Sequence, residues 1–212
     1  MKYLDIENWA RKDQYFFFKE YENPFFNICT TLDIKNLIVY TKANKISLSH
    51  AYLYLSQKAV NETPEMRYRI QGNNVVVYDR IDAGWIMMKN DGSINFCYLK
   101  HTEGFSAFHQ QMQKVSSKLE TMPFDTNEDR DDLVYYSVLP WIHFRSLSHA
   151  HRMPRTDSVP RIVFGKCEEQ NDKVNMPISI EVNHALMDGF HVAQFLDKFQ
   201  YFLDNSKEIL EF

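Results

Sequence analysis

A histidine, an aspartate and a glycine lie at fixed spacing near the C-terminal end of the chain. His184 and Asp188 belong to the segment VNHALMDG (residues 182–189), between a predicted strand and the last predicted helix. Histidine is the side chain best suited to take a proton from a hydroxyl near neutral pH, provided that a second group fixes its tautomer and orientation. Asp188 would give that support directly, or through an ion pair with an arginine.

Two other interpretations of this segment stay open. Asp188 would cap the helix while His184 plays a structural part at the end of the strand. Alternatively, His184, Asp188 and His191 would bind a metal, although the chain offers no other clustered ligands and we predict no metal site.

A serine lies in an apolar stretch that ends in proline and tryptophan, YYSVLPW (residues 135–141). The hydroxyl of Ser137 would donate a hydrogen bond to an oxyanion, a role that stabilises a transition state strongly when the donor is preorganised. The alternative is a small residue bonded to the backbone. Because no Gly-x-Ser-x-Gly pattern occurs, we do not expect Ser137 to be a nucleophile. A third segment, WARKD (residues 9–13), contains Arg11.

Hydrophobic periodicity predicts the elements that position these groups. We expect a helix cap at Asp33 and another at Ser47 or Ser49, and an antiparallel meander over residues 67–98. Strands and helices do not alternate regularly, which predicts an α+β fold, a mixed β-sheet flanked by helices, in one domain over residues 1–212. The pattern predicts helices over residues 9–21, 35–42, 48–61, 105–119 and 188–204, and strands over residues 25–34, 68–70, 75–78, 86–88, 94–98, 133–139, 161–167 and 174–183.

Composition excludes several classes of function. The 212 residues are 44% hydrophobic and 25% charged, which is typical of a globular protein, and 15% aromatic, which indicates a large core, a sticky interface or both. The net charge of −4 argues against nucleic-acid binding, which needs a basic face. Three cysteines without CxxC spacing favour a reducing compartment. With no signal peptide and no bilayer-spanning segment, we expect a soluble, cytoplasmic protein.

Taken together and in this order, the segments resemble one family, the chloramphenicol acetyltransferases. The resemblance covers essentially the whole chain, and VNHALMDGFHV (residues 182–192) is its most specific part. The other matching segments are W-x-R-K at 9–12, LDI at 32–34, AVN at 59–61 with Arg67 following, S-x-x-P-W at 137–141, GK at 165–166, and the remainder of 177–191.

The resemblance implies an α/β sandwich that assembles as a homotrimer, with active sites at the subunit interfaces and acetyl-CoA as co-substrate. His184 is implied as the general base that deprotonates the acceptor hydroxyl, and Ser137 as the donor to the oxyanion. Asp188 is implied to pair with Arg11 and to hold the histidine loop in shape. Transfer is implied to be direct, without an acyl-enzyme. Lys166 is implied on the coenzyme side, where a cation would assist a polyphosphate.

The departures from the family lie mainly in the implied acceptor pocket. Asn183 occupies the position of a second histidine in well-known members. A glutamate or histidine buried in an apolar pocket costs desolvation energy unless it is paired. The pocket positions are Phe17, which is retained, and Phe18, Glu22, Leu147, His149 and Val163, which replace a tyrosine, an apolar residue, a phenylalanine, a leucine and a threonine.

The sequence therefore predicts an acetyl-CoA-dependent O-acetyltransferase that acts on chloramphenicol or a related acceptor. One alternative is an acyltransferase for a different alcohol, and another is a catalytically silent homologue that binds a ligand. A catalytic core of the dihydrolipoyl acyltransferase type is disfavoured, because no lipoyl domain and no Pro/Ala-rich linker are present. A role in antibiotic resistance stays open.

Overall fold

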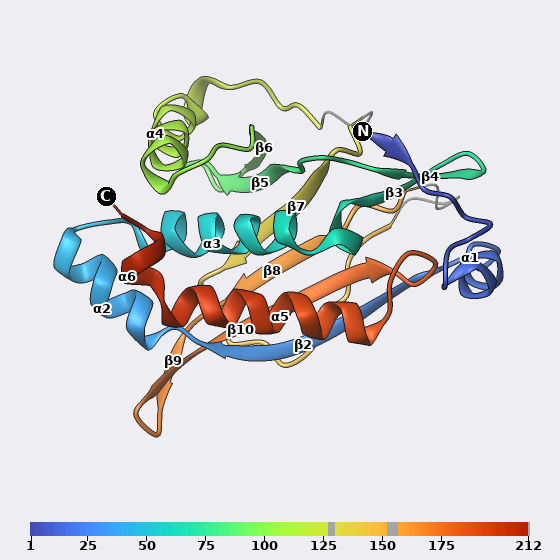
Figure 1. Ribbon diagram of the computed structural model, residues 1–212. Helices are drawn as coiled ribbons and strands as arrows, with labels where there is room; N and C mark the ends of the chain where they lie inside the picture. The colour runs from blue at the N-terminus through green and yellow to red at the C-terminus, as the bar shows by residue number, and fades with distance from the viewer. Residues whose placement is uncertain (127–129, 152–156, 212) are drawn as a thin grey trace.

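The computed structural model describes residues 1–126, 130–151 and 157–211, and a twisted sheet with helices packed against it dominates the fold (Figure 1). The strands are β1 (Lys2–Tyr3), β2 (Phe25–Asp33), β3 (Tyr68–Gln71), β4 (Asn74–Val77), β5 (Asp82–Met88), β6 (Ile94–Leu99), β7 (Leu133–Leu139), β8 (Arg161–Gly165), β9 (Glu168–Gln170) and β10 (Lys173–Asn183). The helices are α1 (Lys12–Phe18), α2 (Lys35–Asn44), α3 (Leu48–Glu62), α4 (Phe105–Ser116), α5 (Gly189–Asp204) and α6 (Ser206–Ile209), with 3₁₀ helices η1 (Pro64–Arg67) and η2 (Leu119–Thr121).

The main sheet has seven strands and mixed pairing. Its order is β2, β10, β8, β7, β5, β6, with β9 paired to β10 off this path. β7 pairs in parallel with both β5 and β8, whereas β10 is antiparallel to β2, β8 and β9, and β5 is antiparallel to β6. The predicted α+β fold with a mixed sheet flanked by helices is confirmed.

Strand β10 shows how the two faces of the sheet differ. Every second residue from Met176 to Val182 is apolar and fully buried in the main core, which α5 also lines. Side chains alternate along a strand, so Ser179, Glu181 and Asn183 point to the other face. These three polar residues are buried as well, and buried polar groups need partners. The face of the sheet that α3 and α5 do not cover therefore contains buried polar side chains that need partners.

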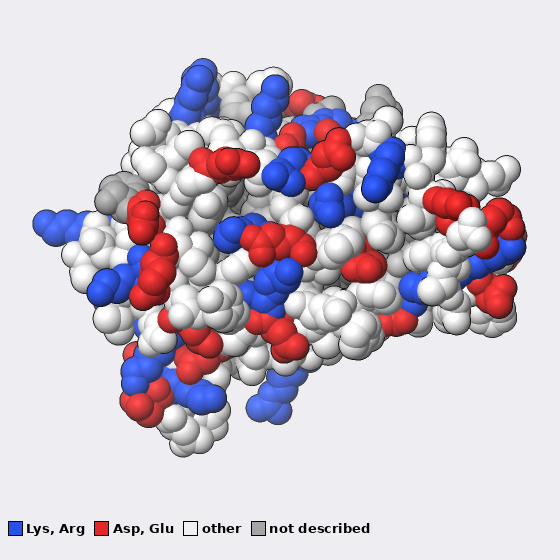
Figure 2. Space-filling model, in the orientation of Figure 1, with Lys and Arg blue, Asp and Glu red and all other residues white. Residues whose placement is uncertain are grey.

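Helices α3 and α5 lie side by side along the core face of the sheet (Figure 1). Ser47 is the N-cap of α3, and its hydroxyl accepts a hydrogen bond from the His50 amide. It is one of the two alternative caps predicted for this helix. Figure 2 shows that both signs of charge are interspersed over this side of the molecule, without a large basic area. None of the described helices is long and apolar enough to cross a membrane.

The predicted single meander over residues 67–98 is wrong. β3 and β4 form a hairpin that joins β1 in a separate three-stranded sheet, whereas β5 and β6 form a hairpin in the main sheet. Both hairpin turns were predicted, and Gly72 and Gly92 adopt the positive φ angles that such turns require. Local turn chemistry fixes each hairpin but does not specify which strands the hairpin meets next.

Several element boundaries also differ from the prediction. The first helix is limited to Lys12–Phe18, β5 begins four residues earlier at Asp82, and β9 was not predicted. Helix α2 has Ile34 at its N-cap, although the Asp33 carboxylate accepts from the Lys35 amide at 3.0 Å.

Candidate active site

The His184 loop is a tight turn directly after β10. The Asn183 carbonyl accepts hydrogen bonds from the amides of Leu186 and Met187, at 3.0 and 3.2 Å, and its side-chain oxygen accepts from the Ala185 amide at 3.0 Å. The His184 amide donates to the Pro24 carbonyl at 2.7 Å. Asn183 therefore bonds within the turn, and it fixes the backbone on which His184 is carried.

Aromatic rings hold the His184 imidazole. It stacks on Phe18 with a centroid distance of 3.9 Å and an interplanar angle of 6°, and it lies 4.6 Å from the ring of Phe26. Its Nδ1 is buried and has no hydrogen-bond partner among the described residues. Phe17 and Tyr21 extend the aromatic cluster outward from Phe18, and both are exposed. The predicted base thus lies beside one predicted acceptor-pocket residue, Phe18, and a second one, Phe17, packs against Phe18.

Arg11 ties the loop to the start of α1. One guanidinium nitrogen donates to the Asp188 carboxylate, and the other donates to the His184 carbonyl oxygen at 2.9 Å. The arginine side chain is only 11% exposed, whereas that of Asp188 is 37% exposed. The ion pair with an arginine, one of the two predicted ways for Asp188 to support His184, is present in the structure.

Asp188 also begins α5, where its carboxylate accepts from the Phe190 amide at 3.0 Å. Burial raises the pKa of the Asp188 carboxyl, but its electrostatic interactions with His191 and Arg11 and the hydrogen bond from the Phe190 amide outweigh burial and lower the pKa below its usual value. No hydrogen bond between the Asp188 carboxylate and the His184 ring is found in the described parts of the chain. Asp188 is thus connected to His184 through Arg11 and the backbone, and it caps α5 at the same time.

Ser137 lies in a second region, a cavity of about 370 Å³ on the polar face of the sheet. It pairs across the sheet with Val163 on β8, and His149 closes the cavity from the segment that follows β7. Burial lowers the pKa of His149, and its Nε2 has no partner within the described structure. The cavity is lined by Ile86, Phe96, Thr126, Tyr135, Tyr136, Ser137, His149, Ala150, Arg161, Ile162 and Val163.

The sequence interpretation missed a buried ionic cluster beside this cavity. Glu181 is 5% exposed, and its carboxylate lies 3.1 Å from His151 Nε2 and 3.4 Å from a guanidinium nitrogen of Arg161. Arg161 also pairs with Asp157 at 2.9 Å and lies over the ring of Phe25. A glutamate among the apolar residues of β10 was the available signal, but its partners come from other segments.

The His184 and Ser137 regions are far apart in one chain. Ser137, Val163 and Ser179 lie in one row across β7, β8 and β10, and His184 follows Ser179 by five positions. With a rise of about 3.4 Å per residue and a strand spacing of about 4.8 Å, the two backbone positions are roughly 17 Å apart along the strands and 10 Å apart across them. A single chain does not bring these groups together.

The remaining predicted site residues are Glu22, Leu147 and Lys166. Glu22 is exposed, so it bears no desolvation cost within the chain, and Leu147 is half-buried. Lys166 is exposed directly after β8, where its amide donates to the Ile142 carbonyl at 2.9 Å.

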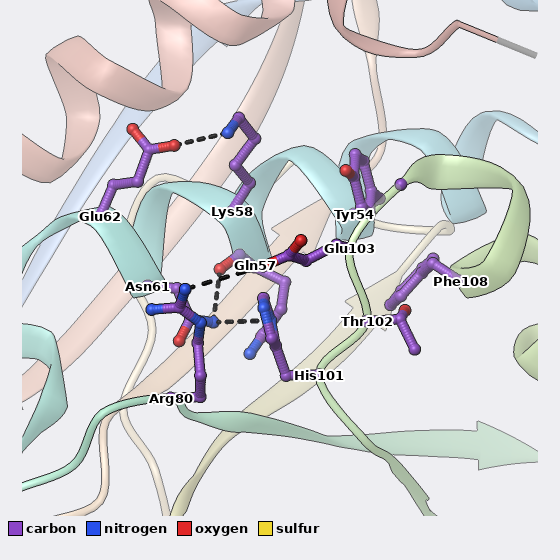
Figure 3. A pocket seen from close by; sticks show the side chains of 11 residues that line it. Tyr54, Gln57, Lys58, Asn61, Glu62, Arg80, His101, Thr102, Glu103 and Phe108 are labelled. Atoms are coloured by element: carbon purple, nitrogen blue, oxygen red, sulfur yellow. Dashed lines mark hydrogen bonds and ion pairs between the residues drawn. The ribbon is translucent and has the colours of Figure 1, made fainter.

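A different cavity of about 300 Å³ lies beside the C-terminal half of α3 (Figure 3). None of the predicted site residues lines it. The side-chain oxygen of Asn61 accepts a hydrogen bond from the Ile81 amide there, and its side-chain nitrogen donates to the Ile81 carbonyl. The Asn61 side chain also points toward His101. This geometry gives the AVN segment at 59–61 a structural function, because Asn61 fixes the chain where β5 begins.

Comparisons with known proteins identify the fold and the family. A solved chloramphenicol acetyltransferase superposes with a TM-score of 0.86 and 28% identity, covering 95% of this chain and 99% of that one. A dihydrolipoamide acetyltransferase from Azotobacter vinelandii superposes with a TM-score of 0.70 over 93% of this chain and 88% of that one, at 15% identity, which shows a shared fold alone. The chain therefore has the fold that chloramphenicol acetyltransferase and dihydrolipoamide acetyltransferase share.

The sequence relatives define the family. A chloramphenicol acetyltransferase from Proteus mirabilis is 27% identical over 213 residues, covering 95% of this chain and 94% of the relative, and one from Escherichia coli is 26% identical over 203 residues, covering 95% and 93%. The family model described as chloramphenicol acetyltransferase matches residues 1–200. The chain belongs to the chloramphenicol acetyltransferase family, and it is an acetyltransferase with acetyl-CoA as co-substrate, as predicted.

Proposed function

We propose that this enzyme transfers the acetyl group of acetyl-CoA directly to a hydroxyl of chloramphenicol or a related alcohol. His184 takes the proton of the acceptor hydroxyl while the oxygen of that hydroxyl attacks the thioester carbonyl. The tetrahedral intermediate then collapses, the carbon–sulfur bond breaks, and the CoA thiolate takes the proton from His184. Ser137 donates a hydrogen bond to the oxyanion of that intermediate, which is most effective when the donor is already in position.

The observation that carries this proposal is the anchoring of the His184 loop. Arg11 bonds to both the Asp188 carboxylate and the His184 carbonyl, while the His184 ring stacks on Phe18. A general base is effective only when its position is fixed. A histidine that merely ended a strand would need neither the buried arginine nor the aromatic stack.

We further propose that a homotrimer completes the site. A base and an oxyanion donor must both lie within roughly 3 Å of one reacting group, and the strand register separates His184 from Ser137 by far more than that. A neighbouring copy would supply the second residue at an interface, which would also cover the exposed Phe17 and Tyr21.

Because acetyl-CoA is a cytoplasmic metabolite and all three cysteines are free, we infer a cytoplasmic enzyme of one domain.

Mixed oligomers test the divided site. His184→Ala and Ser137→Ala subunits, denatured together in equal amounts and refolded, should form hybrids in which roughly one quarter of the sites have both residues, since such an interface takes each residue from a different copy. Activity well above that of either variant alone is the expected result. If the mixture is no more active than the sum of the two variants, the residues act within one chain.

The pocket near Ser137 favours a second candidate, transfer to a more polar alcohol. Arg161 and His149 line the cavity, and Glu181 lies buried next to them. Polar groups in such a cavity favour an acceptor that can bond to them, because unpaired buried polar groups are costly. A nitroaryl alcohol would satisfy fewer of these groups than a hydroxylated compound with further polar substituents.

Release of free CoA thiol from acetyl-CoA, with chloramphenicol and a panel of hydroxylated compounds as acceptors, tests both candidates. We expect turnover that falls by several orders of magnitude in His184→Ala and stays normal in His101→Gln, a histidine of the other cavity. Normal turnover in His184→Ala would refute the assigned base. Coenzyme binding without turnover on any acceptor would identify a silent ligand-binding homologue.

Lys166 is the proposed contact to the coenzyme. An exposed cation after β8 is suited to a polyphosphate as a point charge. Lys166→Ala should raise the KM for acetyl-CoA several-fold, most clearly at low ionic strength, and leave kcat unchanged. An unchanged KM would remove Lys166 from the coenzyme site.

A further inference from the structure

His191 contacts the carboxylate oxygen of Asp188 that Arg11 does not contact, and one of its ring nitrogens has two partners. Its Nδ1 is 3.1 Å from the Asp188 amide nitrogen, which donates to it, and 3.0 Å from a carboxylate oxygen of the same residue. The ring is 13% exposed, and its Nε2 faces the Glu65 carboxylate from η1 at 3.9 Å. Asp188 and His191 together form the capping box that begins α5.

One ring nitrogen cannot serve both partners at once. In the neutral tautomer of His191 with its proton on Nε2, Nδ1 accepts the Asp188 N–H, and the Nε2 proton faces Glu65. In the imidazolium form both nitrogens are donors, so Nδ1–H would bond to the Asp188 carboxylate and the Asp188 amide would lose its acceptor.

The same carboxylate receives Arg11 and the Phe190 amide, so a change at His191 reaches the His184 loop. The charged groups that face His191 are Asp188 on its own turn and Glu65 from η1, with Arg11 behind Asp188. The N-cap of α5 therefore has two arrangements that differ by one proton.

We propose that His191 is a positioning residue whose neutral form holds the Asp188 cap, and with it the His184 loop, in the arrangement that supports acetyl transfer. This inference rests on the proposed function of His184 as the general base. Protonation of His191 moves the hydrogen bond of Nδ1 from the Asp188 amide to the Asp188 carboxylate. This change weakens the contact between Asp188 and Arg11 that holds the His184 loop. Acid then lowers activity through His191 in addition to its effect on the general base.

The matched variant is His191→Gln. Glutamine at the third helical position completes a capping box with its amide oxygen, but it does not titrate. For the wild type we expect log kcat/KM to fall further on the acid side than for His191→Gln, by about the several-fold loss that the missing cap acceptor causes, while His191→Gln keeps kcat near normal at pH 8. His191→Ala, without the cap acceptor, should lose kcat several-fold at every pH.

Hydrogen exchange of the loop gives a readout that does not need activity. In peptides covering residues 185–190, with rates corrected for intrinsic exchange, the wild type should lose roughly tenfold protection between pH 7.5 and 5.5, since one backbone hydrogen bond is lost, whereas His191→Gln should keep it. Identical protection changes and identical acid limbs in the two proteins would overturn the inference. Turnover that survives His184→Ala would instead overturn the proposed function, so the two failures are distinguishable.

Discussion

Replacing Arg11 with methionine tests whether the anchored loop supports catalysis. The substitution keeps much of the side-chain volume and removes the guanidinium that bonds to Asp188 and to the His184 carbonyl. The carbonyl bond has a charged donor and is part-buried, so its loss costs about 2 kcal/mol. The partner carboxylate is 37% exposed and regains water, so we assign the ion pair only about 1 kcal/mol.

The summed loss of about 3 kcal/mol should lower the thermal midpoint by about 6–12 °C for a chain of this length. We also expect kcat to fall about tenfold to a hundredfold, because small displacements of a catalytic group are costly, with a much smaller change in the KM of the acceptor. Thermal unfolding at fixed protein concentration and release of CoA thiol at 20 °C measure the two effects.

A double-mutant cycle and a control separate the loop from general stability. Asp188→Asn keeps a good helix cap, and its combination with Arg11→Met should show a coupling energy on the order of 1 kcal/mol. Arg130→Met is the control, because Arg130 pairs with Asp82 and Asp132 at 2.6 and 2.7 Å, away from His184. Normal kcat in Arg11→Met, or an equal loss of kcat in Arg130→Met, would refute the reasoning.

Three further predictions follow from single positions. Ser137→Ala should lower kcat about tenfold to a thousandfold and leave the affinity for acetyl-CoA unchanged; a loss of affinity alone would remove it from the oxyanion site. Gly165→Ala places a Cβ 2.9 Å from the Ile142 carbonyl oxygen, and urea unfolding should show a loss of about 1–3 kcal/mol, whereas an unchanged midpoint would mean that the loop yields. Burial, together with His109, lowers the pKa of His50 to about 4 in the folded protein, so the unfolded chain binds the proton first and stability should rise with pH between about 4 and 6.5; His50→Gln should flatten that rise, and parallel curves would contradict it.

Local sequence patterns were sufficient for most elements of the fold. The β10 strand, α3 with its Ser47 cap, and α5 beginning after Asp188 were predicted to within a residue or two, because alternation, helical spacing and capping are local properties. The grouping of hairpins was not predictable in this way. β4 pairs with the N-terminal β1, about seventy residues away in the chain, and no turn signal encodes that choice.

The candidate site shows the same difference between local signals and contacts between distant segments. The His184 motif and its link to Arg11 were predicted, because the motif is contiguous and the family resemblance joins its two parts. The cluster of Glu181, Arg161 and His151 was missed, since it depends on the register between β8 and β10 and on the segment that packs over them. A single charged residue in an apolar strand indicates that a partner exists, but only the register identifies it.

The carboxylate of Asp188 is where the two halves of the active loop meet. From one side Arg11 joins it to the His184 carbonyl, and from the other His191 and the Phe190 amide join it to α5. A carboxylate with donors on both sides keeps a low pKa and stays ionised throughout the range in which histidines titrate. Its charge is therefore constant while the protons on its neighbours change. The loop can thus be rigid enough to hold a general base against the aromatic rings beside it and still respond to acid through His191, without any change in Asp188 itself.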